Sequence, residues 1–292
     1  MSKLDYSVML EEGHVILLPP YPLESRGNLA EPDVHAESAT QLYPIGTLLW
    51  YPGLGKKYRY SKAGTAHVHP RQLMYNGNLV PDAASHANED GFYGKHQVDG
   101  SNVARAAGAT ELSFTDTINR VKDYYAGGYL IHWGADEYES SHIISGPAAP
   151  TVSTWQNTVV KLLRPKKQAV ISGEDIQIWL NPYSNISTHE FVASGEARQF
   201  QTAMGVAELL IQDGFYFWLQ TAGPVFVQPN GWVDNCPGYN PNKRMVYPIK
   251  MGGIITPQGV ALQGDQVIGV LLSRTLDGSA DAFINLDLDL GH

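Results

Sequence analysis

Short apolar segments, each ended by turn residues, recur along the middle of this chain and limit what it can fold into. Five of them follow one another between residues 109 and 183: ATELSFTDTI, GGYLIHWG, SSHIISG, NTVVKLLRP and EDIQIWLNPY. Segments of this length, separated by turn residues at intervals of about ten residues, are typical of a β-sandwich or barrel. We therefore predict a mainly β fold with sandwich-like or barrel-like regions and long loops.

The same pattern divides the chain into three parts. Residues 1–41 mix prolines and charges with little periodicity, so we expect an extended N-terminal arm that becomes ordered by lying on a neighbour. Residues 42–188 are predicted to form one β-rich domain, and residues 189–292 a second. Helix is expected only at Ser194–Gln201, with one further helical turn near Asn102–Ala107.

Composition restricts the function. The formal net charge is −9, whereas binding to nucleic acid needs a basic surface that releases counterions, so we expect no nucleic-acid partner. Charged residues make up 17% of the chain, well under the roughly 25% typical of soluble domains, which is what a subunit with large contacts would show. The single cysteine, Cys236, excludes an intrachain disulfide and a zinc site built from several thiolates.

No membrane span or secretion signal is expected in the sequence. Near the N-terminus the apolar run extends only from Val15 to Leu18, which is too short for the apolar core of a signal peptide, and Glu11 and Glu12 precede it. No run approaches the roughly 20 apolar residues of a membrane helix. We expect a protein made and folded in the cytoplasm.

The stretch GFYFWLQT, residues 214–221, carries four aromatic residues in succession. In a strand, Phe215 and Phe217 would point to one face, and Tyr216 and Trp218 to the other. Both faces then carry large apolar groups, which a strand buried on both sides explains without a ligand. A sugar-stacking platform or a subunit contact through Tyr216 and Trp218 are the alternatives. We predict two core strands on either side of Gly223 and Pro224.

The basic stretch KKYRYSK, residues 56–62, alternates cations with tyrosines. As a strand it would place Lys57 and Arg59 on one face, and Tyr58 and Tyr60 on the other. A half-buried strand with a solvated basic edge accounts for this pattern, and an ion-pair patch for an acidic partner is the functional alternative. The candidate interface residues are therefore Lys57, Tyr58, Arg59, Tyr60, Tyr216 and Trp218.

Catalytic and metal-binding patterns are weak. His67 and His69 have a spacing that can ligate a metal, but no third ligand can be named from the sequence. The carboxylates of Asp136, Glu137 and Glu139, and those of Glu174 and Asp175, are explained by exposed turns. The ending LDLDL, residues 286–290, alternates strictly and predicts a strand with leucines inward and aspartates outward. We expect no catalytic, metal or cofactor site.

Several segments taken together resemble a known group of proteins. They are KKYRYSKAGTA, DGSNVARAAGATELSFTDT, DYYAGGYLIHWG, NPYSNI, GFYFWLQTAGPVFV and IGVLLSRTLDGSADAFINLDLDL. In order and turn chemistry they resemble virion structural proteins of tailed bacteriophages, and most closely head decoration or cement proteins. The resemblance implies a non-enzymatic protein on the outer capsid surface of the virion, with the major capsid protein as its partner. It brings no catalytic residues.

The physical properties agree with that expectation. A subunit outside a DNA-filled shell needs no basic charge, and an extended arm can cross a seam between capsomers. Binding at symmetry-related sites favours a homo-oligomer, with a trimer matching the threefold positions of the shell. Two alternatives remain. One is a tail or fibre component that binds host glycans through Trp133, Trp155, Trp179 or Trp218. The other is a depolymerase that uses a carboxylate pair drawn from Asp136, Glu139 and Asp175.

Overall fold

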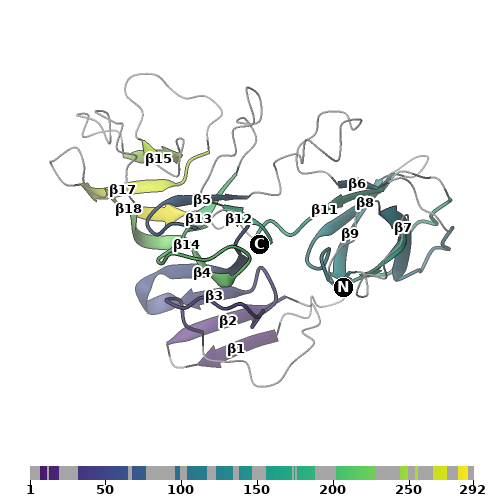
Figure 1. The fold of residues 1–292 in the computed structure, drawn as a ribbon, viewed down its shortest axis with the longest axis horizontal. Helices are drawn as coiled ribbons and strands as arrows, with labels where there is room; N and C mark the ends of the chain where they lie inside the picture. Colours follow the sequence, from purple (N-terminus) through teal and green to yellow (C-terminus); the bar gives the residue numbers. More distant parts are fainter. Residues whose placement is uncertain are drawn as a thin grey trace. The chain divides into compact units, whose positions relative to one another are not determined.

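The structure is a computed structural model of the chain. It describes residues 7–11, 13–19, 32–64, 68–76, 96–98, 104–116, 123–133, 138–146, 156–172, 174, 176–187, 202–227, 244–248, 254–255, 266–274 and 282–288. Strands dominate these residues (Figure 1), and none of them lies in an α-helix, which confirms the mainly β prediction.

The strands are β1 (Ser7–Glu11), β2 (His14–Leu18), β3 (Leu48–Tyr51), β4 (Lys56–Lys62), β5 (Leu73–Asn76), β6 (His96–Val98), β7 (Glu111–Asp116), β8 (Tyr129–Trp133), β9 (Tyr138–Ser145), β10 (Gln156–Leu162), β11 (Ile176–Trp179), β12 (Ile186–Ser187), β13 (Ala203–Val206), β14 (Tyr216–Val227), β15 (Met245–Pro248), β16 (Ile254–Ile255), β17 (Gly269–Arg274) and β18 (Ala282–Asp287). A single 3-10 turn, η1 (Pro52–Leu54), separates β3 from β4.

Two sheets contain these strands. The larger sheet has the order β1-β2-β3-β4-β14-β18-β17-β15-β16, and β13 links it to β5 and β12. The smaller sheet has the order β6-β11-β8-β9-β10-β7. Short antiparallel strands of this kind are what the spacing of turn residues predicts.

The chain divides into two compact units. Unit 1 comprises Met1–Ser7, Leu18–Arg26 and Pro81–Pro182, and unit 2 comprises Val8–Leu17, Gly27–Val80 and Tyr183–His292. This division differs from the one drawn from sequence, because β4 pairs with β14 and β5 pairs with β12 and β13, so residues 42–80 pack with the C-terminal part. The boundary expected at residue 188 lies close to the observed one after Pro182.

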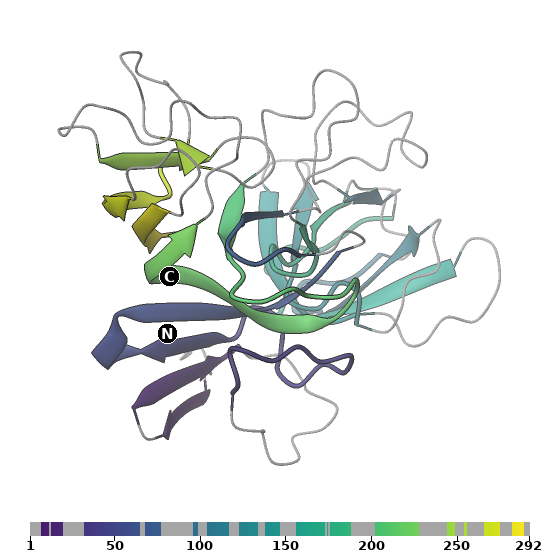
Figure 2. The same ribbon diagram turned by 60° about the vertical axis from the view of Figure 1, so that its left-hand side comes forward.

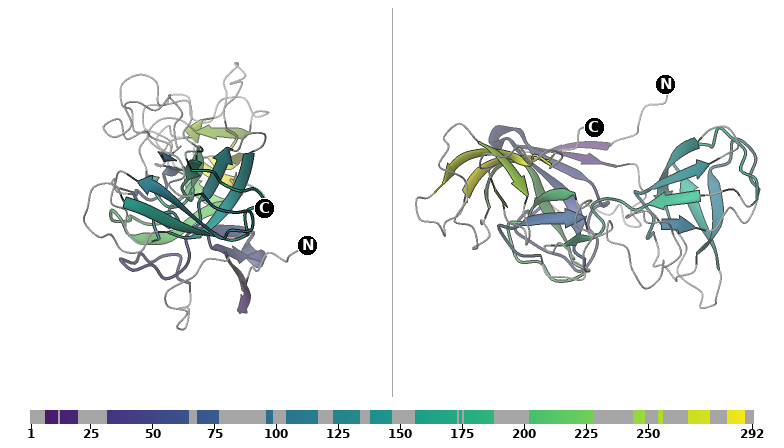
Figure 3. Two further views of the ribbon diagram at one scale, coloured as in Figure 1. Left: turned by 90° about the vertical axis from the view of Figure 1, so that its right-hand side faces the viewer. Right: turned by 90° about the horizontal axis from the view of Figure 1, so that it is seen from above.

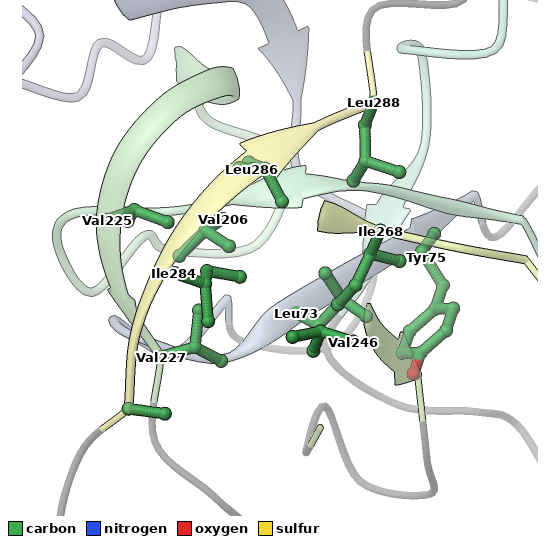
Figure 4. Close-up of a cluster of buried hydrophobic side chains, with 12 residues drawn as sticks. Leu73, Tyr75, Val206, Val225, Val227, Val246, Ile268, Ile284, Leu286 and Leu288 are labelled. Atoms are coloured by element: carbon green, nitrogen blue, oxygen red, sulfur yellow. The ribbon is translucent and has the colours of Figure 1, made fainter. Parts of the chain in front are cut away.

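Unit 2 buries one face of its C-terminal strands. Ala282, Ile284 and Leu286 alternate along β18 with more exposed residues, as the period of two along a strand requires. They pack with side chains of β14 and β15 and, from the opposite side, with Leu73 and Val206 of β5 and β13 (Figure 4). The sheet is curled so that these strands enclose a core.

Strand β14 runs without interruption from Tyr216 to Val227 (the long curved green strand in Figure 2). The expectation of two strands broken at Gly223 and Pro224 is wrong. The first part of β14 pairs with β4 and the second part with β18, and the strand bends where the two pairings meet at Ala222. Pro224 is tolerated because the strand has changed partners there, and Gly223 adopts the positive φ of 94° that the bend requires.

Unit 1 contains the smaller sheet, which curls so that its edge strands β6 and β7 approach each other (Figure 3). Its interior holds Leu112 and Phe114 of β7, Leu130 of β8, and Ile176 and Ile178 of β11, all fully buried. The described part of the turn expected at Asn102–Ala107 is not helical, since Arg105 instead exchanges backbone hydrogen bonds with Val170. The helix expected at Ser194–Gln201 lies outside the described residues.

In the N-terminal arm, β1 and β2 are extended, as expected, whereas the described residues from 32 to 41 form turns and bends with one β-bridge at Ser38, and both parts pair within their own chain. β2 is hydrogen-bonded to β3, and Ile16 is buried. Further along, Ser38 exchanges two backbone hydrogen bonds with Tyr216, and Glu37 accepts hydrogen bonds from the backbone and side chain of Gln212. These residues are therefore part of unit 2.

Candidate interaction surface

Large apolar side chains gather on the solvent side of the C-terminal strands of unit 2. We call this set the outer apolar face; it consists of Phe226 of β14, Met245 of β15, Val270 and Leu272 of β17, and Phe283 of β18. Phe226 and Met245 are 55% and 56% exposed, and Val270 and Leu272 are 44% and 48% exposed. Because these half-exposed groups lie on adjacent strands, they form a candidate contact surface.

Strand register explains why these residues lie together. Phe226 is opposite Phe283, with their ring centroids 4.7 Å apart, and Val270 is opposite Met245. Leu272 lies where the register of β17 and β18 shifts, so the strand carries one extra side chain. Since Val225, Ile284 and Val246 fill the core on the inner side, the residues between them are left facing out.

The predicted interface residues are placed differently. Tyr58, Tyr60 and Trp218 are 2% exposed each, and Tyr60 and Trp218 pack edge to face at 5.0 Å. Tyr43 completes this group, with its ring centroid 5.1 Å from that of Trp218. The strand buried on both sides that the sequence favours for GFYFWLQT is therefore what the structure shows, and Trp218 is covered within its own chain.

Arg59 is also buried, so the prediction of a solvated basic edge on this strand is wrong for this residue. Its Nη1 donates a hydrogen bond of 3.1 Å to the carbonyl of Gly46, and its guanidinium lies 6.0 Å from the ring centroid of Tyr183. Lys57 is half-buried on the same strand. Pairing of β4 with both β3 and β14 covers this strand on its two edges, which an alternating pattern alone does not reveal.

Tyr216 is the candidate closest to solvent besides Lys57. It is half-buried, stacks on Tyr60 with an interplanar angle of 8°, and lies 5.4 Å from the ammonium group of Lys62. Burial raises the pKa of its phenol, so it remains neutral. Neither Lys57 nor Tyr216 adjoins the outer apolar face in the strand register.

The sequence did not reveal a charged cluster around Glu208. Its carboxylate accepts hydrogen bonds from Lys56 Nζ at 3.1 Å and from Tyr58 Oη at 2.8 Å, and His35 Nδ1 lies 3.3 Å away. Burial, followed by the negative charge of Glu208, raises the pKa of Tyr58. The cluster ties residues near the N-terminus to β4.

Two of the carboxylates predicted to lie in exposed turns are instead engaged inside unit 1. Glu139 Oε2 lies 3.1 Å from Nζ of Lys166, whose side chain is fully buried, and Glu174 Oε2 lies 2.7 Å from Nε2 of the buried His132. Burial raises the pKa of Glu139, but backbone hydrogen bonds from Lys167 and Gln168 together with the contact with Lys166 outweigh it, and the net shift is downward.

The pKa of Glu174 is also lowered by internal hydrogen bonds. The hydrogen bond from the backbone amide of Ile171 is the main reason that the pKa of Glu174 is lowered, and the contact with His132 adds to it. For Lys166, burial lowers the pKa and Glu139 opposes that shift. Each carboxylate is therefore held in its charged form by internal partners. Asp136, Glu137 and Asp175 lie outside the described residues.

A metal-ligand group and a membrane-spanning helix are two further kinds of site to consider among the described residues. His67 lies outside these residues, and within them no three His, Cys, Asp or Glu side chains form a group suited to a metal ion. Nor do any of them form a helix long and apolar enough to cross a membrane.

The tryptophans proposed as glycan platforms have mixed placements. Trp218 is buried and Trp179 is half-buried, while Trp155 and the side chain of Trp133 lie outside what the structure describes. Trp50 of β3, which was not among them, is 38% exposed.

Comparison with family models, with curated proteins and with solved structures finds no match for this chain.

Proposed function

We propose that this chain is a non-enzymatic structural protein of a tailed-phage virion, which binds the outer surface of the head and stabilises it. The observation that carries the proposal is the outer apolar face, because a protein that leaves such a surface on its sheet is built to be covered by another protein. The low content of charged residues points the same way. The resemblance of six segments to virion structural proteins supplies the context.

The acidic charge of the chain supports an outer position on the shell. A protein with a formal charge of −9 is repelled by packaged DNA and is compatible with the exterior of the particle. The partner proposed there is the major capsid protein of the same virion.

The internal carboxylates support the non-enzymatic part of the proposal. A general acid needs a pKa raised toward the working pH, whereas the pKa values of Glu139 and Glu174 are both lowered. Glu139 is also bound to the buried Lys166 and Glu174 to the buried imidazole of His132, so the two carboxylates resemble a structural network rather than a hydrolytic site.

The copy number of this protein in purified virions tests the proposal. Quantitative mass spectrometry would compare its amount with that of the major capsid protein of the same particles. We expect a simple ratio between the two, as a shell-covering protein requires. A copy number that fits only a tail, a vertex or a fibre would overturn head binding and favour a host-recognition role.

A second measurement tests the stabilising role. Particles that lack this protein should release their DNA at a lower temperature than complete particles, as followed by a DNA-binding dye. Adding the purified protein back should restore the higher temperature. An unchanged release temperature would contradict the cement function even if the copy number is high.

A further inference from the structure

Unit 1 carries a segment in which all the charges are positive. Residues 140–173 contain four of the chain's 20 lysines and arginines and none of its 29 aspartates and glutamates. The four lie within residues 161–167, KLLRPKK, which include the end of β10 and the bends that follow it. A chain with a formal charge of −9 therefore concentrates positive charge at one place.

Three of these four side chains are exposed. We call Lys161, Arg164 and Lys167 the basic patch. Nζ of Lys161 lies 3.8 Å from Oε1 of Glu111, but both side chains are exposed, and an exposed pair of this kind is weak. Within the part of the chain that the structure describes, the side chains of Arg164 and Lys167 have no acidic partner. The basic patch is therefore available to carboxylates of another molecule.

The acidic residues that flank this segment in the sequence, Glu139 and Glu174, are engaged inside unit 1. Glu139 lies 3.1 Å from Nζ of the buried Lys166 and accepts a hydrogen bond from the amide of Lys167. Glu174 contacts the buried His132 at 2.7 Å. The charge of Glu139 is thus offset by Lys166, whereas the positive charges of the basic patch have no such counterpart.

The backbone that presents Arg164 is held on both sides. The amide of Leu163 donates a hydrogen bond to the carbonyl of His142, and the amide of Lys166 donates one to the carbonyl of Ala109. A side chain on a held backbone loses less conformational freedom when a partner binds than one on a loop that must first become ordered. The arrangement favours binding by the basic patch.

We infer that the basic patch is a docking site for a cluster of carboxylates on another protein. The inference rests on the proposed function for the identity of that protein, the major capsid protein, and adds the chemistry of the contact. The guanidinium group of Arg164 can bind a carboxylate through two parallel hydrogen bonds. The ammonium groups of Lys161 and Lys167 add attraction that steers the encounter.

The charge of the whole chain favours a protein over nucleic acid at this site. DNA is a long polyanion that extends beyond three cations and meets the acidic remainder of the chain, which repels it. A cluster of carboxylates on a protein surface can be confined to the area of the basic patch. Local attraction then acts without the repulsion that a longer polyanion meets.

Charge reversal tests the basic patch. The natural protein and the double variant Arg164→Glu with Lys167→Glu would be titrated onto particles that lack this protein, and the bound fraction measured by co-sedimentation. We expect the double variant to bind about tenfold more weakly or less, because like charges then face each other. Arg164→Lys with Lys167→Arg keeps the charges and should bind better than the reversed variant. Equal binding by the natural and reversed proteins would overturn the inference.

Arg71→Glu is the matched control for Arg164→Glu alone. Arg71 is exposed in the turn before β5 of unit 2, so the two variants change the net charge by the same amount at different places. Arg164→Glu should weaken binding to particles, and Arg71→Glu should not. Circular dichroism verifies the fold of each variant. Equal losses would show that net charge rather than the basic patch controls binding, and would overturn the inference.

Carbodiimide coupling identifies the partner's groups directly. The reagent activates a carboxylate, which a lysine amine in contact with it then attacks to form an amide. Mass spectrometry of treated particles should find Lys161 or Lys167 joined to aspartate or glutamate of the major capsid protein. Coupling to that protein through other lysines alone would overturn the inference.

These outcomes are separable from those of the head-binding proposal. If the natural protein binds particles and the reversed variant binds equally well, only the inference fails. If the natural protein does not bind particles at all, the proposed function fails and the inference fails with it. A gel shift of linear DNA by the natural protein, lost in the reversed variant, would assign the basic patch to nucleic acid and overturn the inference.

Discussion

Lys166 places an ammonium group in the interior of unit 1, where a charge without a partner is costly. Glu139 supplies the partner and in addition accepts backbone hydrogen bonds from Lys167 and Gln168. These contacts hold the pKa of Glu139 below its ordinary 4.5. Because the depressed pKa belongs to the folded state, the stabilisation is present above the ordinary pKa and is lost as the pH falls through the folded value.

We predict that the free energy of unfolding decreases as the pH is lowered below about 4.5. At pH 7, Glu139→Gln should be less stable than the natural sequence by about 3 kcal/mol, because it leaves Lys166 buried without its counter-charge. Urea unfolding at several pH values, followed by far-ultraviolet circular dichroism, measures both effects. The free energy of unfolding of Glu139→Gln should also decrease less at low pH than that of the natural sequence.

Glu111→Gln is the matched control for this prediction. Glu111 and Lys161 lie 3.8 Å apart in the same unit, but their side chains are 49% and 61% exposed. Exposed pairs contribute at most about 1 kcal/mol, so the change should be small. If Glu139→Gln and Glu111→Gln lowered the free energy of unfolding by the same amount, the burial of Lys166 would not determine the strength of its ion pair.

At the scale of elements, β14 is the strand on which unit 2 depends. It pairs with β4 along its first part, with β18 along its second part, and with β13 at Gln220. The change of partner requires a bend, and the bend is located at Gly223. A Cβ atom at this position would lie 2.5 Å from the carbonyl oxygen of Gly55, which belongs to the backbone and cannot move aside easily.

We predict that Gly223→Ala lowers the free energy of unfolding by about 3 kcal/mol, because it combines an unfavourable positive φ with this steric clash. Thermal or urea denaturation measures the loss. Gly53→Ala in η1 should change stability by less than about 1 kcal/mol, since no atom lies within 4 Å of the added methyl group. A Gly223→Ala variant as stable as the Gly53→Ala variant would contradict the role given to the bend.

The elements that the sequence predicted well are those whose pattern is local. The alternation in LDLDL correctly indicates that Leu286 and Leu288 face the core and that Asp287 faces solvent, and the turn spacing correctly indicates many short strands. The local pattern does not show which strands become neighbours. Because β4 and β14 are separated by more than 150 residues, the sequence could not show that β4 lies between β3 and β14 or that Arg59 is buried there.

The candidate surface was missed for a related reason. In GVLLSR both alternating positions are apolar, and such a run predicts a strand buried on both faces. The exposure of Val270 and Leu272 follows only from the absence of a covering layer within the described chain. The pattern of apolar residues is the same whether a strand face is covered by another molecule or by the protein's own core, so the sequence alone does not distinguish the two.

At the scale of the whole molecule, the largest segment of unit 1, Pro81–Pro182, is inserted into the sequence of unit 2. The chain leaves unit 2 after β5 and returns at β12, and these two strands are paired, with Ile186 opposite Asn76 and Ser187 opposite Tyr75. Paired residues on adjacent antiparallel strands lie only about 5 Å apart. The two ends of the insertion therefore start from neighbouring points on one sheet, which is the geometry that allows a domain to be inserted without disturbing its host.

We predict that unit 2 folds without the inserted segment. Replacing residues 81–182 by a short Gly-Ser linker should leave a protein that unfolds cooperatively, because the core around Ile284 and Val206 and the whole outer apolar face belong to unit 2. Calorimetry of the variant should show a single transition, and light scattering should give the same number of copies as the full chain. A variant that folds but no longer associates would place the contact between copies in unit 1, and a variant that does not fold would show that unit 2 depends on its insertion for stability.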